Sequence, residues 1–176
     1  MAAYKHDEDI KIASNRPSQD IRKESEQLAL DKEYSYQKES GNLDIAENLG
    51  RVFARQVLGF QVAGDCEGQD KVLFAFAAVC AIEAGMNRLC GISALSGFYN
   101  FLMETDREFY DKLDKAFSFY YLSLRKGLEV ERKIGLNFAM LCGNENNARF
   151  SQRGSDMYRE FLADFTQKID ESEFNE

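Results

Sequence analysis

The sequence predicts an all-α protein, a single-domain irregular bundle of about five to seven helices. Pro17 is the only proline in the chain, and proline is the residue that most strongly disrupts a helix. After Pro17, apolar residues recur at three- and four-residue spacing in one segment after another, which is the period of a helix face. The chain has 176 residues, 44% of them hydrophobic, enough for one domain with its own core.

The expected organisation has three parts. Residues 1–16 are polar and are predicted to be disordered or loosely attached, residues 17–170 form the helical domain, and residues 171–176 form a frayed acidic tail. The first helix is predicted to enter at Pro17, to cover 18–38 and to end at Gly41. It is highly charged and has only a thin apolar stripe, so it packs either on the domain or on a partner.

The second helix is predicted to begin after Asn42, whose side chain suits an N-cap, and to continue to about residue 58. Gly50 and Ala54 are small and lie four residues apart, so they share a face on which another helix can approach closely. A glycine-containing loop is predicted over residues 59–69.

The segment 71–84 is apolar on nearly every side, as in a helix buried at the centre of a bundle. A buried strand is the alternative, but the length of the segment and its many alanines favour a helix. Asp70 is the predicted N-cap and Gly85 the predicted C-cap. Its apolar stretch, 72–82, is shorter than the roughly 20 residues that a membrane span requires.

Four further helices are predicted, over about 89–104, 106–125, 129–142 and 148–169. The second of these helices has the clearest local signal at its start, since Thr105 and Glu108 have the spacing of a capping box that would open the helix from residue 106. Gly91 and Gly97 weaken the helix before it. No internal repeat of solenoid length is present.

The charge balance argues against two classes of partner. The formal net charge is −8, and the lysines and arginines are spread along the chain. Neither a nucleic acid nor an anionic membrane surface is therefore expected as a direct partner. The cysteines form no C-x-x-C pair, which predicts reduced thiols and a cytoplasmic protein. They stand at positions 66, 80, 90 and 142.

No residues stand out as catalytic or metal-ligating. His6 is the only histidine, so a charge relay or a histidine-ligated metal inside the fold is not available. No cofactor is predicted, and an enzyme that uses carboxylates, tyrosine or cysteine is the least favoured class, because no nucleophile has a recognisable base beside it.

Glu83 is the most informative single charge, because it directly follows the apolar segment. With Asn87 and Arg88 close behind, three interpretations are open, the least favoured of which is an active-site role. Glu83 reaches water or pairs with Arg88 or another arginine as a structural group. Alternatively, Glu83, Asn87 and Arg88 lie at the mouth of an internal pocket and anchor a polar ligand.

The aromatic residues of the segment 117–121 cannot all share one helix face. Phe119 is predicted to point outward beside Tyr121. For Phe98 and Phe101, one helix earlier, it is likewise open whether the side chains point outward or into the core. These four residues form a protein interface, such as a dimer contact, or else belong to a wide core stripe.

These features favour a non-enzymatic protein-interaction module in the cytoplasm. An inhibitor or antitoxin-like binder of a basic partner falls in this class, because a strongly acidic protein attracts basic surfaces. The expected partner is another protein or a second copy of this chain. The alternative is a small-molecule-binding helical bundle with its pocket near Glu83.

Overall fold

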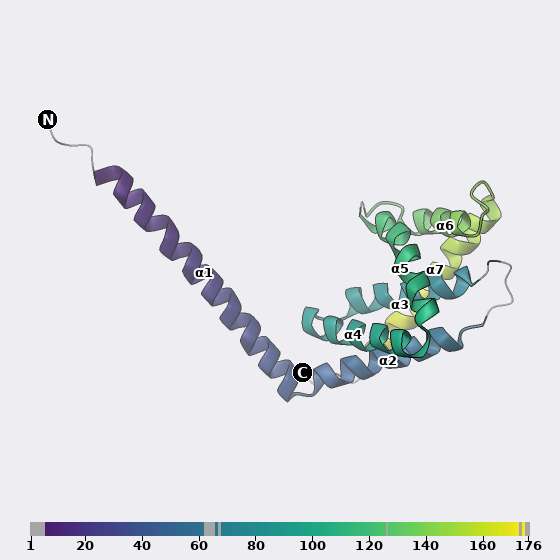
Figure 1. Ribbon diagram of the computed structural model, residues 1–176, viewed down its shortest axis with the longest axis horizontal. Coiled ribbons are helices and arrows are strands. Elements are labelled where there is room, and N and C mark those ends of the chain that lie inside the picture. Colours follow the sequence, from purple (N-terminus) through teal and green to yellow (C-terminus); the bar gives the residue numbers. More distant parts are fainter. Residues whose placement is uncertain (1–5, 62–65, 67, 126, 173, 175–176) are drawn as a thin grey trace. The chain divides into compact units, whose positions relative to one another are not determined.

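The computed structural model describes residues 6–61, 66, 68–125, 127–172 and 174 (Figure 1). Within this part of the chain there are seven helices and no strand, so the predicted all-α fold is confirmed. The helices are α1 (His6–Glu39), α2 (Asn42–Gly59), α3 (Gln69–Gly85), α4 (Arg88–Thr105), α5 (Arg107–Leu124), α6 (Val130–Leu141) and α7 (Ala148–Asp170).

The chain divides into two compact units, one ending at Ser40 and one beginning at Gly41. The first unit is built on α1, which begins at His6 and contains Pro17, so it starts before the predicted entry. Residues 6–16, expected to be loose, are part of this helix. Proline removes one backbone donor, and the residues around it are otherwise free of prolines.

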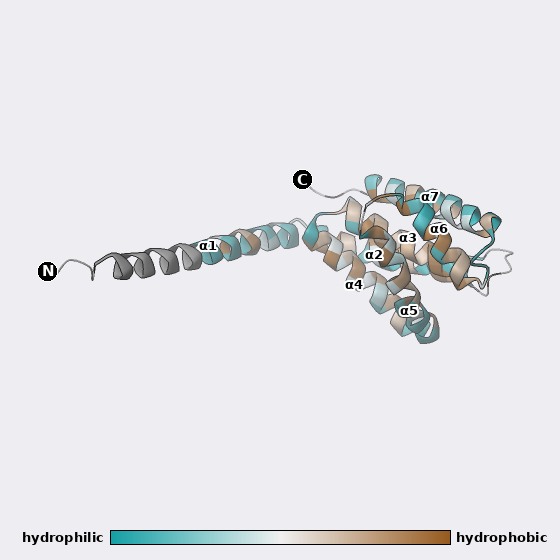
Figure 2. Ribbon diagram, turned by 90° about the horizontal axis from the view of Figure 1, so that it is seen from above, coloured by the Kyte–Doolittle hydropathy of each residue, from teal (hydrophilic) through white to brown (hydrophobic). Residues whose placement is uncertain are grey.

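Some predicted segments lie partly outside the described residues. These are residues 1–5 of the N-terminal segment, 62–65 and 67 of the loop, and 173, 175 and 176 of the tail. In the second unit, α2–α7 form the bundle. Figure 2 shows hydrophobic residues concentrated in these helices, whereas the coloured part of α1 is mostly hydrophilic.

Helix α3 is the centre of the bundle, as predicted for 71–84. Every residue from 72 to 82 is buried. The helix packs against α2, α4, α5, α6 and α7, so it has no side left for water. This position explains why the segment lacks the polar face that a surface helix needs.

Phe76 anchors an aromatic cluster on one side of α3. Its ring lies 5.0 Å from the ring of Tyr120, 5.2 Å from Phe117 and 5.3 Å from Tyr121, measured between centroids. Tyr158 on α7 lies 6.2 Å away. Aromatic pairs at these distances stabilise a core beyond the area they bury, and here they join α3, α5 and α7.

Helices α2 and α4 cross at backbone contact distance. A Cβ atom added to Gly50 would lie 1.9 Å from the carbonyl oxygen of Ala94, and one added to Gly97 would lie 2.2 Å from that of Glu47. The close approach predicted at Gly50 is therefore confirmed. Gly97, predicted only to weaken its helix, is the matching contact on α4.

The predicted side-chain caps of α2 and α3 are wrong. Both helices begin earlier than predicted, and their N-caps are glycines in the left-handed conformation, Gly41 with φ 79° and Gly68 with φ 83°. Glycine adopts this conformation without steric cost, so the chain turns into each helix there. Asn42 and Asp70 thus lie inside the first turns.

The predicted capping box at 105–108 is shifted by one residue. Thr105 is the last residue of α4, and the carboxylate of Asp106 accepts a 2.9 Å hydrogen bond from the backbone N–H of Phe109. Asp106 is thus both the C-cap of α4 and the N-cap of α5. A single residue joins the two helices, which places them side by side in sequence and in space.

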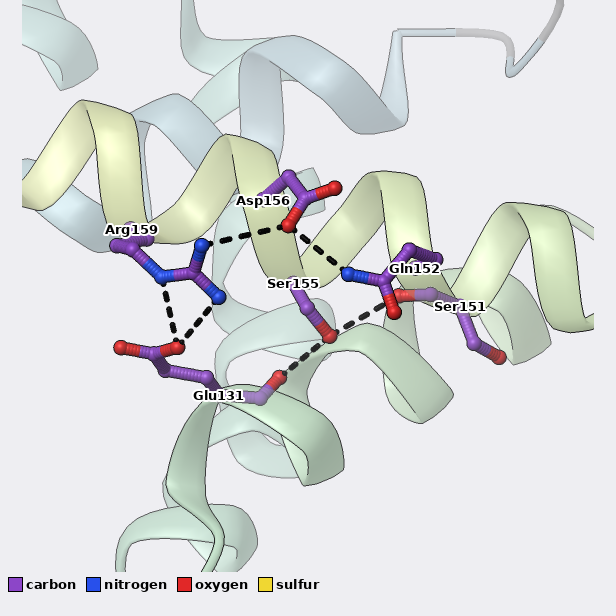
Figure 3. A network of polar contacts seen from close by, with 6 residues as sticks. All are labelled: Glu131, Ser151, Gln152, Ser155, Asp156 and Arg159. Carbon is purple, nitrogen blue, oxygen red and sulfur yellow. Dashed lines mark hydrogen bonds and ion pairs between the residues drawn. The ribbon is translucent and has the colours of Figure 1, made fainter.

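Helices α6 and α7 are joined by a network of polar contacts (Figure 3). Ser155 donates to the backbone oxygens of Glu131 and Ser151, and Arg159 pairs with Glu131 at 2.9 Å and with Asp156 at 3.5 Å. Gly135 on α6 lets the helices meet, since a Cβ there would lie 2.2 Å from the Ser151 carbonyl oxygen.

Candidate functional site

A half-open groove of about 350 Å³ lies against α5, with α4 contributing one wall. Its lining residues come from two helices that a one-residue connection brings together. They are Tyr99 from α4 and Tyr110, Leu113, Asp114, Phe117, Ser118 and Tyr121 from α5. We call this feature the tyrosine groove.

Helical spacing explains why these α5 side chains share the groove. Residues 110, 114, 117 and 121 follow one another at three- and four-residue steps, and residue 118 lies four residues after 114, which puts all five on one face of the helix. Leu113 and Phe117 are buried and form the floor, whereas Asp114 and Ser118 are exposed at the rim. The groove therefore has an apolar base and a polar edge.

The two tyrosine walls face each other across the α4–α5 contact. The rings of Tyr99 and Tyr110 meet edge to face with their centroids 6.2 Å apart, and both side chains are half-buried. The guanidinium of Arg107 lies 5.7 Å from the centre of the Tyr110 ring and is also paired with Asp111 at 3.2 Å. A cation thus already lies over one aromatic wall residue.

Glu83 reaches the groove through Tyr121. The Tyr121 hydroxyl donates to Oε1 of Glu83 over 3.1 Å, from α5 to the end of α3. Glu83 is exposed, and among the described residues its carboxylate has no ion pair with a lysine or arginine. The predicted pairing with Arg88 is therefore not observed.

The hydroxyls at this end of the groove stay protonated. Burial raises the pKa of Tyr121, and the negative charge of Glu83, together with that of Tyr99 once Tyr99 ionises, adds to the effect. Burial likewise raises the pKa of Tyr99, with Glu83 again contributing, while a hydrogen bond with Tyr121 opposes the shift. Both tyrosines are therefore neutral hydrogen-bonding groups at physiological pH.

Asn87 and Arg88, predicted to join Glu83 in a ligand site, belong to the start of α4. The Asn87 side chain accepts a 2.9 Å hydrogen bond from the backbone N–H of Cys90, which is an N-cap contact. Arg88 is the first residue of α4 and is exposed. None of the three predicted residues lines the tyrosine groove, and only Glu83 contacts a lining residue, through its hydrogen bond with Tyr121.

The four predicted interface residues occupy different environments. Phe98 is fully buried, with 0% exposure, so its side chain is part of the core and is not available to a partner. Phe101 is half-buried beneath the guanidinium of Arg55, 5.5 Å from the ring centre. Tyr121 lines the groove, and Phe119 points outward with 42% exposure.

Phe119 belongs to a wider set of exposed large hydrophobic residues on α5, α6 and the loop between them. We call this set the Phe119 patch, and it consists of Phe119, Leu122, Leu128 and Leu136. The two helices are held together beside it by Asn137, which donates to the Phe119 carbonyl oxygen at 2.8 Å and to Ser123 Oγ at 2.7 Å.

The described part of the chain contains neither a metal-binding cluster nor a membrane-spanning helix. No group of three or more histidine, cysteine or acidic side chains there has a geometry that could hold a metal ion. No helix in that part combines the length and apolarity needed to cross a membrane. Cys66, Cys80, Cys90 and Cys142 form no disulfide with one another.

Sequence reasoning did not identify the tyrosine groove, although a signal was present. In α5 an exposed acidic residue, Asp114, stands between aromatic residues at i−4, i+3 and i+7. That spacing puts a carboxylate within an aromatic stripe. What the sequence could not supply was the opposite wall, because nothing in it specifies that Tyr99 faces this stripe.

The fold and the groove define an all-α protein with an acidic aromatic surface site. Comparison with protein-family models, with curated proteins and with solved structures finds no match to this chain. The geometry of the groove is therefore the basis on which a function is proposed.

Proposed function

We propose that this chain is a non-enzymatic protein-interaction module whose recognition surface is the tyrosine groove. One observation carries the proposal. A half-open groove of about 350 Å³ combines three tyrosines with the carboxylate of Asp114, and Tyr121 hydrogen-bonds the Glu83 carboxylate beside it. Neither carboxylate has an ion pair with a described lysine or arginine. An inhibitor or antitoxin-like binder of a basic partner falls in this class.

The dimensions and the position of the groove support this function. Binding pockets commonly have volumes of about 300–1,000 Å³, an apolar lining and a few placed polar groups. The tyrosine groove has this composition. Its walls are held by two helices, which position side chains more rigidly than loops do.

The environments of the candidate nucleophiles support a non-enzymatic role. Burial raises the pKa of Cys80 to about 12, with Glu83 contributing and a hydrogen bond from Tyr158 opposing the shift. Burial also raises the pKa of Cys142, as does its contact with Cys66. An activated thiol has a lowered pKa instead, so these environments favour binding over covalent chemistry.

Nuclear magnetic resonance of the isotopically labelled full chain tests the proposal. Small aromatic fragments of positive, neutral and negative charge are added, and the amide shifts of α4 and α5 are followed. We expect saturable shifts around Tyr99, Tyr110 and Ser118. The variant Ser118→Trp fills the groove from its exposed rim and should abolish them. Shifts that persist in this variant, or that map elsewhere, would contradict the proposal.

The Phe119 patch favours a second function, self-association with another copy of this chain. An ordinary protein surface exposes large hydrophobic residues singly, whereas this patch has four on neighbouring segments of the chain. Charges of both signs adjoin them, since Glu129 and Arg132 form an ion pair at the start of α6. A surface of this kind can pair with its own copy.

Light scattering on the intact chain tests self-association through the patch. Phe119→Ser should lower the average mass if the patch forms the contact. Ile92→Ser is the matched control, because Ile92 is 57% exposed on α4, away from the patch. A monomeric parent protein, or an equal response to both substitutions, would exclude this second function.

The cytoplasm is the compartment we propose. That the four cysteines form no disulfide with one another supports it, because structural disulfides are typical of secreted proteins. Non-reducing electrophoresis of protein extracted with a thiol-blocking reagent checks this, with fully blocked cysteines as the expected result.

A further inference from the structure

We propose that the tyrosine groove receives the cationic side chain of an arginine or lysine presented by a partner protein. This inference rests on the proposed function and adds the chemistry of the occupant. It follows from the charge and the ring faces that the groove presents, and from its half-open shape.

The lining of the groove attracts positive charge in two ways. The faces of aromatic rings carry a negative potential, so a cation within about 6 Å of a ring centre is stabilised. Asp114 at the rim and Glu83 behind Tyr121 add two carboxylates. Among the described lining residues there is no lysine or arginine, and the nearby Arg107 guanidinium, over the Tyr110 ring, is paired with Asp111.

The chain itself shows that one wall residue attracts a cation. The Arg107 guanidinium lies over the Tyr110 ring at 5.7 Å. Arg107 is exposed and paired with Asp111, and it does not line the groove. An arginine or lysine from a partner would make the same kind of contact from the groove side, where Asp114 supplies a carboxylate.

The shape of the groove favours a side chain over a free metabolite. Small-molecule sites commonly bury about 70–90% of the ligand surface, which a half-open groove does not do. An arginine or lysine side chain leaves its own backbone outside, where the exposed rim residues Asp114 and Ser118 can contact the partner. The long methylene stems of both side chains suit the apolar floor of Leu113 and Phe117.

Tyr121 has a positioning role in this scheme. Its hydroxyl donates to Glu83, which holds the carboxylate beside the groove. A cation in the groove strengthens this arrangement, because the carboxylate then faces positive charge on one side and a hydrogen-bond donor on the other. Tyr121→Phe keeps the aromatic ring and removes the hydroxyl that contacts Glu83 and Tyr99.

Capped pentapeptides of glycine with one central variable residue provide the test. Arginine and lysine are compared with their uncharged counterparts citrulline and acetyl-lysine, by the amide shifts of the labelled full chain. We expect the charged peptides to bind at the groove at least about tenfold more tightly than the uncharged ones. Methylguanidinium alone should bind more weakly than the arginine peptide.

Four variants separate the effect of charge at the groove from that of the overall charge. Glu83→Gln and Asp114→Asn should each weaken arginine-peptide binding several-fold, and Tyr121→Phe should weaken it less. Glu145→Gln, an exposed change of the same charge in the turn before α7, should have no effect. All four positions are at least half-exposed or keep their ring, so the fold is retained.

Each other outcome has a defined meaning. Equal binding of charged and uncharged peptides at the groove would overturn the cation inference and leave the binding function standing. Methylguanidinium binding as tightly as the arginine peptide would replace the partner side chain with a free ligand. Absence of all peptide binding would overturn the inference, and absence of fragment binding as well would overturn the proposed function.

Discussion

Arg153 on α7 donates to Oδ2 of Asp70 on α3 over 2.9 Å, and the Asp70 side chain is only 7% exposed. This ion pair fastens the last helix to the start of the central one. A buried carboxylate is costly without a partner, so the guanidinium is what allows Asp70 to lie inside the first turn of α3.

Arg153→Ala should destabilise the fold by about 3 kcal/mol, because it leaves the Asp70 carboxylate buried and unpaired. Arg159→Ala is the control on the same helix. Its ion pair with Glu131 is exposed, and such pairs contribute less than about 1 kcal/mol. Urea unfolding gives both values.

The double variant Asp70→Ala/Arg153→Ala distinguishes a paired interaction from two separate ones. It should cost clearly less than the sum of the two single changes, since the penalty for the stranded charge disappears with the carboxylate. Additive losses would show that the two residues stabilise the protein independently.

Gly50→Ala should destabilise the bundle by about 2–3 kcal/mol, because the new methyl group would overlap the Ala94 carbonyl oxygen and push α2 from α4. Gly59→Ala provides the matched comparison at the end of α2, where a Cβ meets nothing within 4 Å. That change should be neutral or stabilise by up to about 1 kcal/mol. Thermal unfolding of the two variants measures the difference. Equal midpoint temperatures would contradict the close packing of α2 against α4 at Gly50.

The fold was largely predictable because burial imposes a period on the sequence. The all-apolar stretch 72–82 is interpretable without any knowledge of its neighbours, and so is the small-residue face containing Gly50. The burial of Phe98 could not be predicted from the sequence, because its helix is apolar on more than one side. Only the close crossing of α2 and α4 decides which side faces the core. The groove depends on the same kind of pairing between helices.

Alkaline pH should destabilise the protein through its buried tyrosines. The pKa values of Tyr99 and Tyr121 are raised above their ordinary value of 10.0 in the folded state. The unfolded chain therefore loses phenolic protons first, and the stabilising contribution, complete below about pH 10, declines as the pH rises further.

Denaturation with urea at increasing pH measures this decline. The slope should be shallower in Tyr121→Phe, which lacks one of the phenols. A free energy of unfolding that rises above about pH 10, or a slope unchanged by the substitution, would contradict the raised pKa of Tyr121.

Salt should weaken the binding of an arginine peptide to the groove, because Asp114 and Glu83 are exposed charges. The screening length falls from about 30 Å at 0.01 M salt to about 3 Å at 1 M, so a several-fold loss of affinity is expected across that range. The citrulline peptide should respond little. Equal salt responses of the two peptides would argue against recognition of charge.

Fluorescence provides the most direct measurement, because the chain contains no tryptophan. Tyr110→Trp places a single indole on the groove wall. Titration with the arginine peptide should change its emission saturably, and titration with the citrulline peptide should change it only at concentrations at least about tenfold higher. Emission that stays constant, or that responds identically to both peptides, would contradict the assignment of the tyrosine groove as a site for a basic side chain.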